Sequence, residues 1–412
     1  MILKFLILLL NLNMLDSFFL QNNFFTRFNN YFVEMNDDSY HQEYLNYLIE
    51  YKNLDINTNS VKNNLLFFEK NSDIISDEKF KIFRENYKFI EDMNEKLENN
   101  DNNLKLGMNE FFDEIPFYDT SRNLMNEVIP KNFSNELNLD FVKKYKSKPF
   151  NLFKSIINYK NTINWNNTEY LSPVKNQLSC GSCWAFSATS ALESHMRINN
   201  YSVDRLSEQE LVDCSKENFG CNGGWMHRAF DFIIKNNGLY SNNDYEYNAT
   251  TNSCRYKIKE DLEKKCSNNE NCSKCNNCIF FNNELFNNNT LPDDAVKVLG
   301  SNLKDYEFTI PQSVIDISIS LQNGPICIAI DASSFYFQFY KEGVIDIPSN
   351  HSQNLNHAVL LVGIDKDENG LHWIIQNSWG SKWGDNGFAR IRAIDGDGVL
   401  LSNLYGVYPT KI

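Results

Sequence analysis

The distribution of cysteine and tryptophan constrains this chain more than any other feature of its sequence. All ten cysteines fall between Cys180 and Cys327, and all six tryptophans fall between Trp165 and Trp383. The first 160 residues contain neither and are rich in Asn, Lys, Glu and Phe. A chain of 412 residues is long enough for two or three domains. The distribution therefore predicts that two parts of the chain, with different compositions, meet near residue 160.

Composition indicates a globular protein and argues against a nucleic-acid binder. Hydrophobic residues make up 42% of the chain and aromatic residues 14%, as in globular rather than disordered proteins. The formal net charge is −14, and the sequence has no basic patch of the kind that nucleic-acid binders carry.

The N-terminal segment, residues 1–20, has the features of a secretory signal peptide. Lys4 precedes a short apolar run over residues 5–10, which Asn11 and Asp16 end well before the roughly 20 apolar residues of a membrane span. A membrane anchor is the alternative. Secretion would place the cysteines where disulfides persist and would allow glycosylation. Asn-x-Ser/Thr sequons occur at Asn132, Asn166, Asn200, Asn248, Asn271, Asn288 and Asn350.

The two parts of the chain differ in their predicted secondary structure. Apolar residues recur every three or four positions over residues 77–99, which predicts an amphipathic helix. This helix indicates either a small helical domain or a segment that packs on the second part and is later removed. Beyond residue 160, helical stretches come first and β-rich runs such as "HAVLLVGI" follow. That order predicts an α+β protein with segregated layers or lobes. An Asn-rich insertion interrupts it over residues 255–295.

The stretch "QLSCGSCWAF" over residues 177–186 offers three chemistries for its two cysteines. They could form a redox pair, half of a metal site, or a disulfide cysteine next to a reactive one. "CWAFSATSALESHM" is a good helix start, so Cys183 would lie at the positive end of a helix. That position lowers a thiol pKa and favours the nucleophilic thiolate.

A reactive thiolate needs a histidine that can hold a proton, and His357 is the best placed of six. It opens the apolar run "HAVLLVG", which would fix its ring. Asn377 could accept the second imidazole proton under the cover of Trp379. Gln177 could donate its amide to an oxyanion, together with the backbone N–H of Cys183. The other histidines suit surface or core positions: His41, His195, His227, His351 and His372.

Five sequence blocks resemble the signatures of the papain-like cysteine proteases, of the cathepsin L-like kind. They are "PVKNQLSCGSCWAFSA", "LSEQELVDCS", "GCNGGWMHRAF", "NHAVLLVG" and "QNSWGSKWGDNGF", in the family's order within residues 163–410. The resemblance implies two lobes, one helical and one a β-barrel-like sheet, with the active site in a cleft between them. It implies that Cys183 is the nucleophile, His357 the general acid/base, Asn377 its orienting residue and Gln177 the oxyanion donor.

The same resemblance implies the substrate-binding residues. The subsite for the second residue before the scissile bond, S2, would be lined by Met226, Ala329, Ala358 and Tyr405, and further contacts would come from Gly223, Gly224 and Trp379. These residues predict a preference for aliphatic or compact aromatic side chains, with no acidic group to bind arginine. Leu178 departs from the family's usual glycine and could crowd the leaving-group side.

The resemblance extends upstream of the enzyme. "GMNEFFDE" matches a propeptide pattern through Gly107, Asn109, Phe111 and Asp113. The preceding helix matches in part but lacks a paired Glu and Arg, with Ile75 and Lys79 in their places. We expect an inhibitory propeptide over residues 21–155, inhibitor-like over 45–115, which blocks the cleft. A peptidase domain over residues 156–412 would follow, with processing between 150 and 163.

The resemblance also assigns most cysteines. It pairs Cys180 with Cys221 and Cys214 with Cys254, whereas both cysteines of the family's third bridge are missing, with His351 and a leucine near their places. A C-x-x-C redox motif would need a βαβ context, which is missing here. Cys327 is expected to be a buried free thiol. The insertion's cluster predicts two disulfides, with a Cys₄ zinc site as the alternative: Cys266, Cys272, Cys275 and Cys278.

These features together predict a cysteine endopeptidase made as a zymogen. The insertion contains no histidine, unlike the loop of the family's carboxydipeptidase. The alternative is an inactive protease-like binding protein, which usually lacks the nucleophile. We expect no cofactor or metal, a monomer, and protein or peptide substrates. The propeptide would be the intramolecular inhibitor, and cystatin-type proteins are candidate inhibitors. The destination would be the secretory pathway, in a lysosome- or vacuole-like compartment or outside the cell.

Overall fold

The computed structural model describes residues 38–52, 77–99, 103–114, 162–166, 168–256, 291, 295–347 and 354–412. They belong to two compact units, Met1–Asn86 and Tyr87–Ile412, with a boundary inside one helix. The predicted signal peptide, the insertion's four cysteines and His351 lie outside the described residues. No helix within the described ranges is long and apolar enough to cross a membrane.

The first unit packs two amphipathic helices through aromatic side chains. Helix α4 spans Asp38–Lys52, and the first half of helix α6, Asp77–Glu98, belongs to the same unit. The Tyr44 ring lies 4.9 Å from the Phe83 ring and 5.4 Å from the Phe80 ring. All three side chains are buried. The helix that the apolar period predicts is therefore present, with its apolar face covered.

The second unit is built on an antiparallel sheet. Six of its seven strands follow the order β3-β9-β4-β6-β7-β8, and the seventh, β2, pairs with β6. Their bounds are β2 Ile163–Asn164, β3 Asp305–Phe308, β4 Ile326–Ile330, β6 His357–Asp367, β7 Gly370–Gln376, β8 Phe388–Arg392 and β9 Gly406–Lys411. A separate two-stranded sheet joins β1, Lys105–Leu106, to β5, Tyr340–Glu342.

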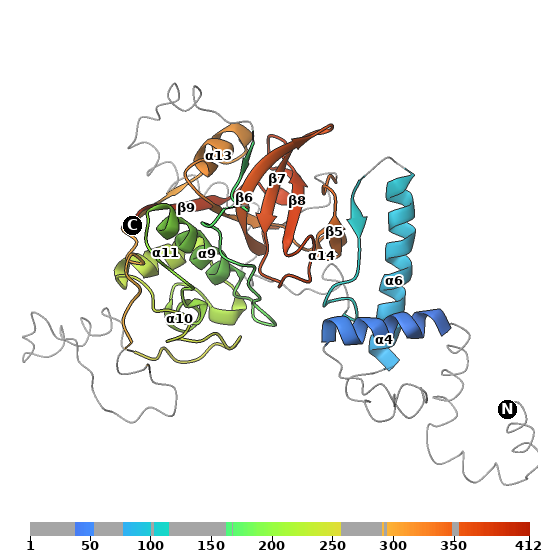
Figure 1. The fold of residues 1–412 in the computed structure, drawn as a ribbon, viewed down its shortest axis with the longest axis horizontal. Helices are drawn as coiled ribbons and strands as arrows, with labels where there is room; N and C mark the ends of the chain where they lie inside the picture. The colour runs from blue at the N-terminus through green and yellow to red at the C-terminus, as the bar shows by residue number, and fades with distance from the viewer. Residues whose placement is uncertain are drawn as a thin grey trace, which may run out of the picture. The chain divides into compact units, whose positions relative to one another are not determined.

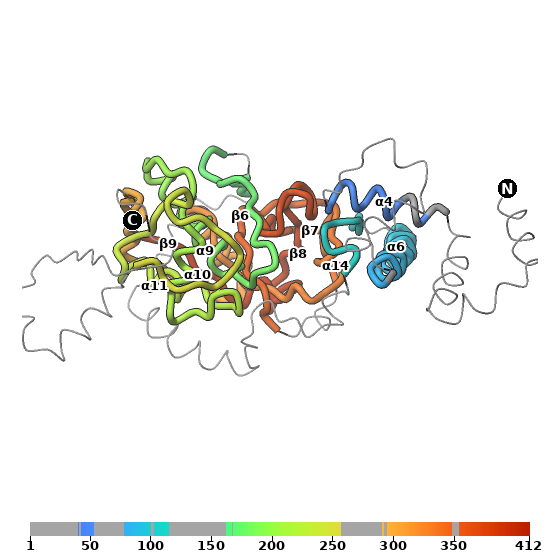
Figure 2. The backbone as a smooth tube through the Cα atoms, turned by 90° about the horizontal axis from the view of Figure 1, so that it is seen from below, coloured from blue at the N-terminus to red at the C-terminus, as the bar shows by residue number. Residues whose placement is uncertain are grey.

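Helices cover one side of strand β6. Helices α9 (Cys183–Ile198), α10 (Glu208–Cys214) and α11 (Met226–Lys235) lie together there, with β7 and β8 on the other side (Figures 1 and 2). Every residue of α9 from Cys183 to Met196 is buried, as expected of a helix packed between other helices and a sheet. Shorter elements complete the unit: η1 Gly220–Asn222, α13 Val314–Leu321, α14 Phe335–Gln338 and η3 Val399–Leu401. The α+β prediction is confirmed.

Two disulfides cross-link the helical part. Cys180 is bonded to Cys221 and Cys214 to Cys254, with Cα atoms 4.7 and 4.8 Å apart. These are the two pairs that the resemblance implies. Cys183 and Cys327 are free and buried.

A buried ion cluster ties α9 to α10. Lys175 Nζ lies 2.8 Å from Glu193 Oε1 and 2.7 Å from Glu208 Oε1, and neither carboxylate is exposed. Burial alone would raise the pKa of Glu208. The charges of Lys175 and Arg205, with hydrogen bonds from Lys175 and Thr189, instead hold that pKa below its usual 4.5. The ionised carboxylate is therefore the form that the fold stabilises.

We expect Glu208→Gln to lower the free energy of unfolding by about 3–5 kcal/mol at pH 7, because it leaves Lys175 partly unpaired. A carboxyl group whose pKa is lowered by folding stabilises the fold at pH values above its unfolded-state pKa. This contribution is lost as the pH falls through its folded-state pKa. The difference between variant and wild type should therefore shrink below pH 4.5. Urea unfolding at several pH values measures it, with exposed Glu246→Gln as the charge-matched control. An equal difference at pH 3 and pH 7 would contradict the assignment.

Candidate active site

Cys183 is the first residue of α9 and is fully buried. Ser182 is the N-cap residue, but its side chain makes no capping bond, so the thiol lies at an open helix N-terminus. The backbone N–H groups of Ala358 and Trp184 form hydrogen bonds to the thiol. The bond to Ala358 places the sulfur next to the start of strand β6, which follows Cys183 by more than 170 positions.

His357 is the first residue of β6 and immediately precedes Ala358. Its Nε2 lies 2.8 Å from Asn377 Oδ1. Its Nδ1 is buried and has no hydrogen-bond partner among the described residues. The Trp379 ring lies 4.8 Å from the imidazole at 35°, and so covers the bond to Asn377. Within the described ranges the fold thus leaves one imidazole nitrogen unpartnered, in the residue next to the Ala358 that donates to the thiol.

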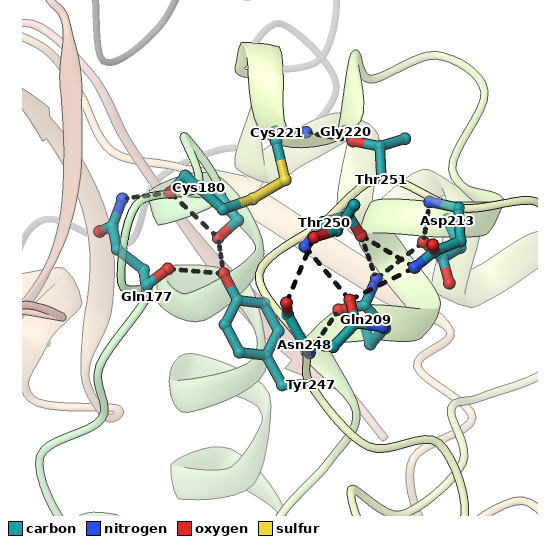
Figure 3. The surroundings of a disulfide bond; sticks show 12 residues. Gln177, Cys180, Gln209, Asp213, Gly220, Cys221, Tyr247, Asn248, Thr250 and Thr251 are labelled. Carbon is teal, nitrogen blue, oxygen red and sulfur yellow. Dashed lines mark hydrogen bonds between the residues drawn. A yellow bond between two sulfur atoms is a disulfide. The ribbon is translucent and has the colours of Figure 1, made fainter.

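Gln177 is held in place at every polar atom of its side chain. Its Nε2 donates to the Cys180 carbonyl at 2.9 Å, and its Oε1 accepts from the Ser378 hydroxyl at 2.7 Å. Tyr247 donates its hydroxyl to the Gln177 carbonyl at 2.7 Å, beside the Cys180–Cys221 disulfide (Figure 3). One N–H of the Gln177 amide remains for another acceptor.

Burial keeps the thiol and the imidazole neutral in this state of the chain. Burial raises the pKa of Cys183 to about 11, against the backbone hydrogen bond from Ala358. Burial also lowers the pKa of His357 to about 4, against the hydrogen bond to Asn377. Both shifts follow from the exclusion of water, which disfavours either charge. The structure therefore favours the uncharged form of both groups.

The segment 103–114 contacts residues at the end of helix α14 and the ring of Trp379. Asn109 Nδ2 donates to the Gln338 carbonyl at 2.6 Å, and the N–H of Gly107 donates to the Phe339 carbonyl at 2.9 Å. The Phe111 ring meets the Trp379 ring edge-on at 5.1 Å. A segment far upstream in the sequence is thus packed on the tryptophan that covers the His357–Asn377 bond.

The residues implied for S2 come together. Ala329 pairs with Ala358 across β4 and β6, and its N–H donates to the Tyr405 carbonyl at 3.3 Å. Met226, Ala329, Ala358 and Tyr405 are all buried in one apolar cluster with Cys183.

The two glycines implied for substrate contact are required by the backbone. Gly223 has φ +112, and a Cβ on Gly224 would lie 2.4 Å from Asn218 Oδ1. The neighbouring Cys221 carbonyl accepts from the N–H of Gly181 at 2.9 Å, which joins this loop to the Cys183 loop.

Leu178 has an unusual conformation. Its φ is +54 and its side chain is 60% exposed, while its N–H donates to Asn176 Oδ1 at 2.8 Å. A left-handed conformation costs a leucine about 1–2 kcal/mol. It explains why the family's usual residue here is glycine, and it leaves an apolar side chain beside Gln177.

Three contacting residues were missed by sequence reasoning. Ser378 and Tyr247 fix Gln177, and His227, expected to be a surface or core histidine, contacts Tyr405 at 2.8 Å. Ser378 lies inside the block "QNSWG", so its position carried a signal. Tyr247 lies in a loop and His227 in the first turn of α11, and both act through contacts with distant residues, which no local pattern reveals.

Comparison with known proteins identifies the family of the chain. The model of the papain family cysteine proteases matches residues 159–403. Digestive cysteine proteinase 3 of Homarus americanus is 33% identical over 314 residues, which cover 76% of this chain and 81% of the relative. Procathepsin L of Felis catus is 33% identical over 319 residues, covering 75% and 80%.

Solved precursor structures are similar over most of the chain. The digestive procathepsin L2 proteinase of Tenebrio molitor larval midgut is 25% identical with a TM-score of 0.62, covering 90% of this chain and 99% of its own. The recombinant stem bromelain precursor is 27% identical with a TM-score of 0.61 and the same two coverages. The chain therefore belongs to the papain family of cysteine proteases, as a cathepsin L-like cysteine endopeptidase with a propeptide.

Proposed function

We propose that this zymogen, once activated, hydrolyses peptide bonds through Cys183 and His357. The Cys183 thiol passes its proton to Nδ1 of His357, and the thiolate attacks the peptide carbonyl carbon. The oxyanion is held by the free N–H of the Gln177 amide and by the backbone N–H of Cys183. His357 then protonates the amine as the C–N bond breaks, which leaves a thioester on Cys183.

Hydrolysis of the thioester completes the cycle. Water attacks the acyl carbon while His357 takes a proton from it, and the C–S bond breaks to release the acid and the thiolate. Asn377 keeps the imidazole oriented through its 2.8 Å bond to Nε2, which leaves Nδ1 for the proton transfers. That bond is the observation that carries the proposal, because it occupies Nε2 and leaves Nδ1 without a hydrogen-bond partner in the described part of the chain.

Residues 21–155 act as the propeptide in this proposal, residues 156–412 as the peptidase domain and residues 1–20 as a signal peptide. The contacts of Asn109 and Phe111 with Gln338 and Trp379 support an inhibitory role. While the site is covered, the Cys183 pKa is raised and the His357 pKa lowered. Removal of the propeptide would readmit water and favour the thiolate–imidazolium pair.

We propose that S2 accepts apolar side chains. Met226, Ala329, Ala358 and Tyr405 supply no ionised group to it, and burial holds the pKa of Tyr405 well above its usual value. The phenol is therefore neutral at any physiological pH. Arginine at this substrate position should be disfavoured relative to leucine.

The proposal includes the secretory pathway, towards a lysosome- or vacuole-like compartment or the outside of the cell. The Cys180–Cys221 and Cys214–Cys254 disulfides support it, since such bonds persist in oxidising compartments. Asn166 and Asn200, at two of the sequons, are exposed and so accessible to glycosylation. No described residue favours the inactive alternative, because Cys183, His357, Asn377 and Gln177 are all present.

A thiol-block assay tests the proposed activity. The full-length chain is brought to acidic pH until the N-terminal segment is lost, and hydrolysis of a fluorogenic peptide with leucine at the second position is followed with and without iodoacetamide. We expect the peptide to be hydrolysed. Alkylation of one thiol per enzyme molecule should abolish this hydrolysis. Hydrolysis that survives alkylation, or a processed chain that hydrolyses no peptide, would contradict the proposal.

The exposed Leu178 side chain should limit the residue that follows the scissile bond. We expect Leu178→Gly to raise kcat/KM about tenfold for a substrate with tryptophan there, relative to one with glycine. The exposed Val296→Gly variant, at a residue 73% exposed outside the site, is the control and should leave this ratio unchanged. An unchanged ratio in Leu178→Gly would show that the side chain does not meet the leaving group.

A further inference from the structure

We propose that His227 is a specificity-determining residue, which fixes the Tyr405 ring at the end of S2 and thereby excludes large side chains. The proposal rests on the peptidase activity proposed above and makes its substrate class narrower. Peptides with valine or leucine at the second position before the scissile bond should be cleaved well, and those with phenylalanine or tyrosine poorly.

The Tyr405 hydroxyl makes two contacts with one residue. It lies 2.8 Å from Nδ1 of the His227 ring and 3.3 Å from the His227 backbone nitrogen. Tyr405 is 1% exposed. A buried hydroxyl without partners would cost about 1–3 kcal/mol, so these contacts hold the ring in one position.

The backbone bond has a fixed direction, and the bond to the ring nitrogen is assigned from the proton that the hydroxyl has to place. The backbone N–H of His227 can only donate, so the Tyr405 oxygen accepts it. Nδ1 of His227 is the acceptor within reach of the hydroxyl proton of Tyr405, so we assign this proton to the bond with Nδ1. The imidazole thus serves as the acceptor of the Tyr405 proton, a role that an apolar side chain at position 227 could not fill.

Other rings surround Tyr405 without giving it a polar partner. The Trp225 ring lies 5.0 Å away and the Phe308 ring 5.9 Å away, the latter edge-on. These contacts support the ring but allow it to slide or tilt, since aromatic contacts tolerate many geometries. The directional restraint in this group comes from His227.

The pair lies close to the reacting thiol. Ala358 donates to the Cys183 thiol, Ala329 pairs with Ala358 in the sheet, and Ala329 donates to the Tyr405 carbonyl. Neighbouring strands are about 4.8 Å apart, so two steps bring Tyr405 to roughly 10 Å from the Ala358 backbone. The second residue of an extended peptide lies about 7 Å from its scissile bond. Its side chain can therefore reach the Tyr405 ring.

Position 227 is placed to act on the same subsite. His227 follows Met226, the first residue of α11, whose side chain is buried in the apolar cluster of Cys183 and Tyr405. Helix α11 thus supplies Met226 as a lining residue of S2. The next residue, His227, is the hydrogen-bond acceptor for Tyr405 at the end of S2. Loss of that acceptor would release Tyr405 from the end of S2 and enlarge the subsite.

The test compares P2 selectivity, the ratio of kcat/KM for leucine over phenylalanine at the second position, in activated enzymes. We expect His227→Ala and Tyr405→Phe each to lower the ratio about tenfold, with the change in KM rather than kcat. The double variant should be no lower than either single one, because both remove the same bond. His227→Asn, whose Oδ1 can replace Nδ1 as acceptor, should restore most of the ratio.

His195→Asn controls for the loss of a buried imidazole. Its Nε2 contacts the Pro325 carbonyl at 3.0 Å outside the site, so it should keep the wild-type ratio even if stability falls. Wild-type ratios in His227→Ala and Tyr405→Phe, or additive effects in the double variant, would overturn the proposal while leaving the peptidase activity intact. A wild-type enzyme without peptidase activity would overturn both.

Discussion

Replacing Cys183 with alanine should reduce kcat/KM for peptide hydrolysis by about 10⁴-fold or more, because no other group at the site can form the acyl-enzyme. Cys183 is one of two free thiols among the described residues, and its thiol alone contacts the start of β6 through Ala358. Both enzymes should be activated by the same added protease. A variant that cannot remove its own propeptide is then not mistaken for one that cannot hydrolyse peptides.

Cys327→Ala is the matched control for this variant. Cys327 is also free and buried, its thiol donates to the Ser187 carbonyl at 3.2 Å, and burial raises its pKa to about 12. It acts as a small apolar side chain in β4, so activity should stay within a few-fold of wild type. Equal hydrolysis by wild type and Cys183→Ala would exclude Cys183 as the nucleophile.

Replacing Gln177 with alanine should lower kcat by about 10²- to 10³-fold with little change in KM, the usual effect of losing one oxyanion donor. The Gln177 amide is held from both ends, by the Cys180 carbonyl and the Ser378 hydroxyl. Its second N–H is therefore preorganised, and the side chain loses little conformational entropy when it bonds to an oxyanion. Steady-state kinetics on the fluorogenic peptide measure this split.

Ser378→Ala separates a direct from an indirect role at this position. It removes one of the two bonds that hold the Gln177 side chain but leaves the donor itself. We expect a loss of kcat of about tenfold, smaller than that of Gln177→Ala. A loss confined to KM in Gln177→Ala would indicate a role in substrate binding rather than in oxyanion stabilisation.

The sequence predicted the helix start at Cys183 and the strand start at His357 because each has a local cause. Good helix formers follow Cys183, and a continuous run of apolar residues follows His357. Their approach depends on the pairing of β4 with β6 and on the packing of α9 against that sheet. Helix α9 packs on strands that follow it by more than a hundred positions, so only the resemblance, not the local pattern, brought the residues together.

Other features had no signal in the residue types of this chain. Leu178, Leu400 and Leu401 have φ values of +54, +57 and +59, a region that leucine rarely adopts. Leu400 and Leu401 are buried near the place of the family's missing third disulfide. Packing of the surrounding chain holds these conformations, and such packing cannot be inferred from residue type. The contact between His227 and Tyr405, 178 positions apart, was unpredictable for the same reason.

Trapping the acyl-enzyme tests most directly the claim that Cys183 forms a thioester during peptide hydrolysis. The activated enzyme is mixed with an activated ester of an N-blocked leucine, quenched in acid within milliseconds, digested and analysed by mass spectrometry. The account predicts an acyl group on the peptide that contains Cys183, removable by hydroxylamine as expected of a thioester. Turnover with no acyl group on Cys183, or with the acyl group on another residue, would contradict it.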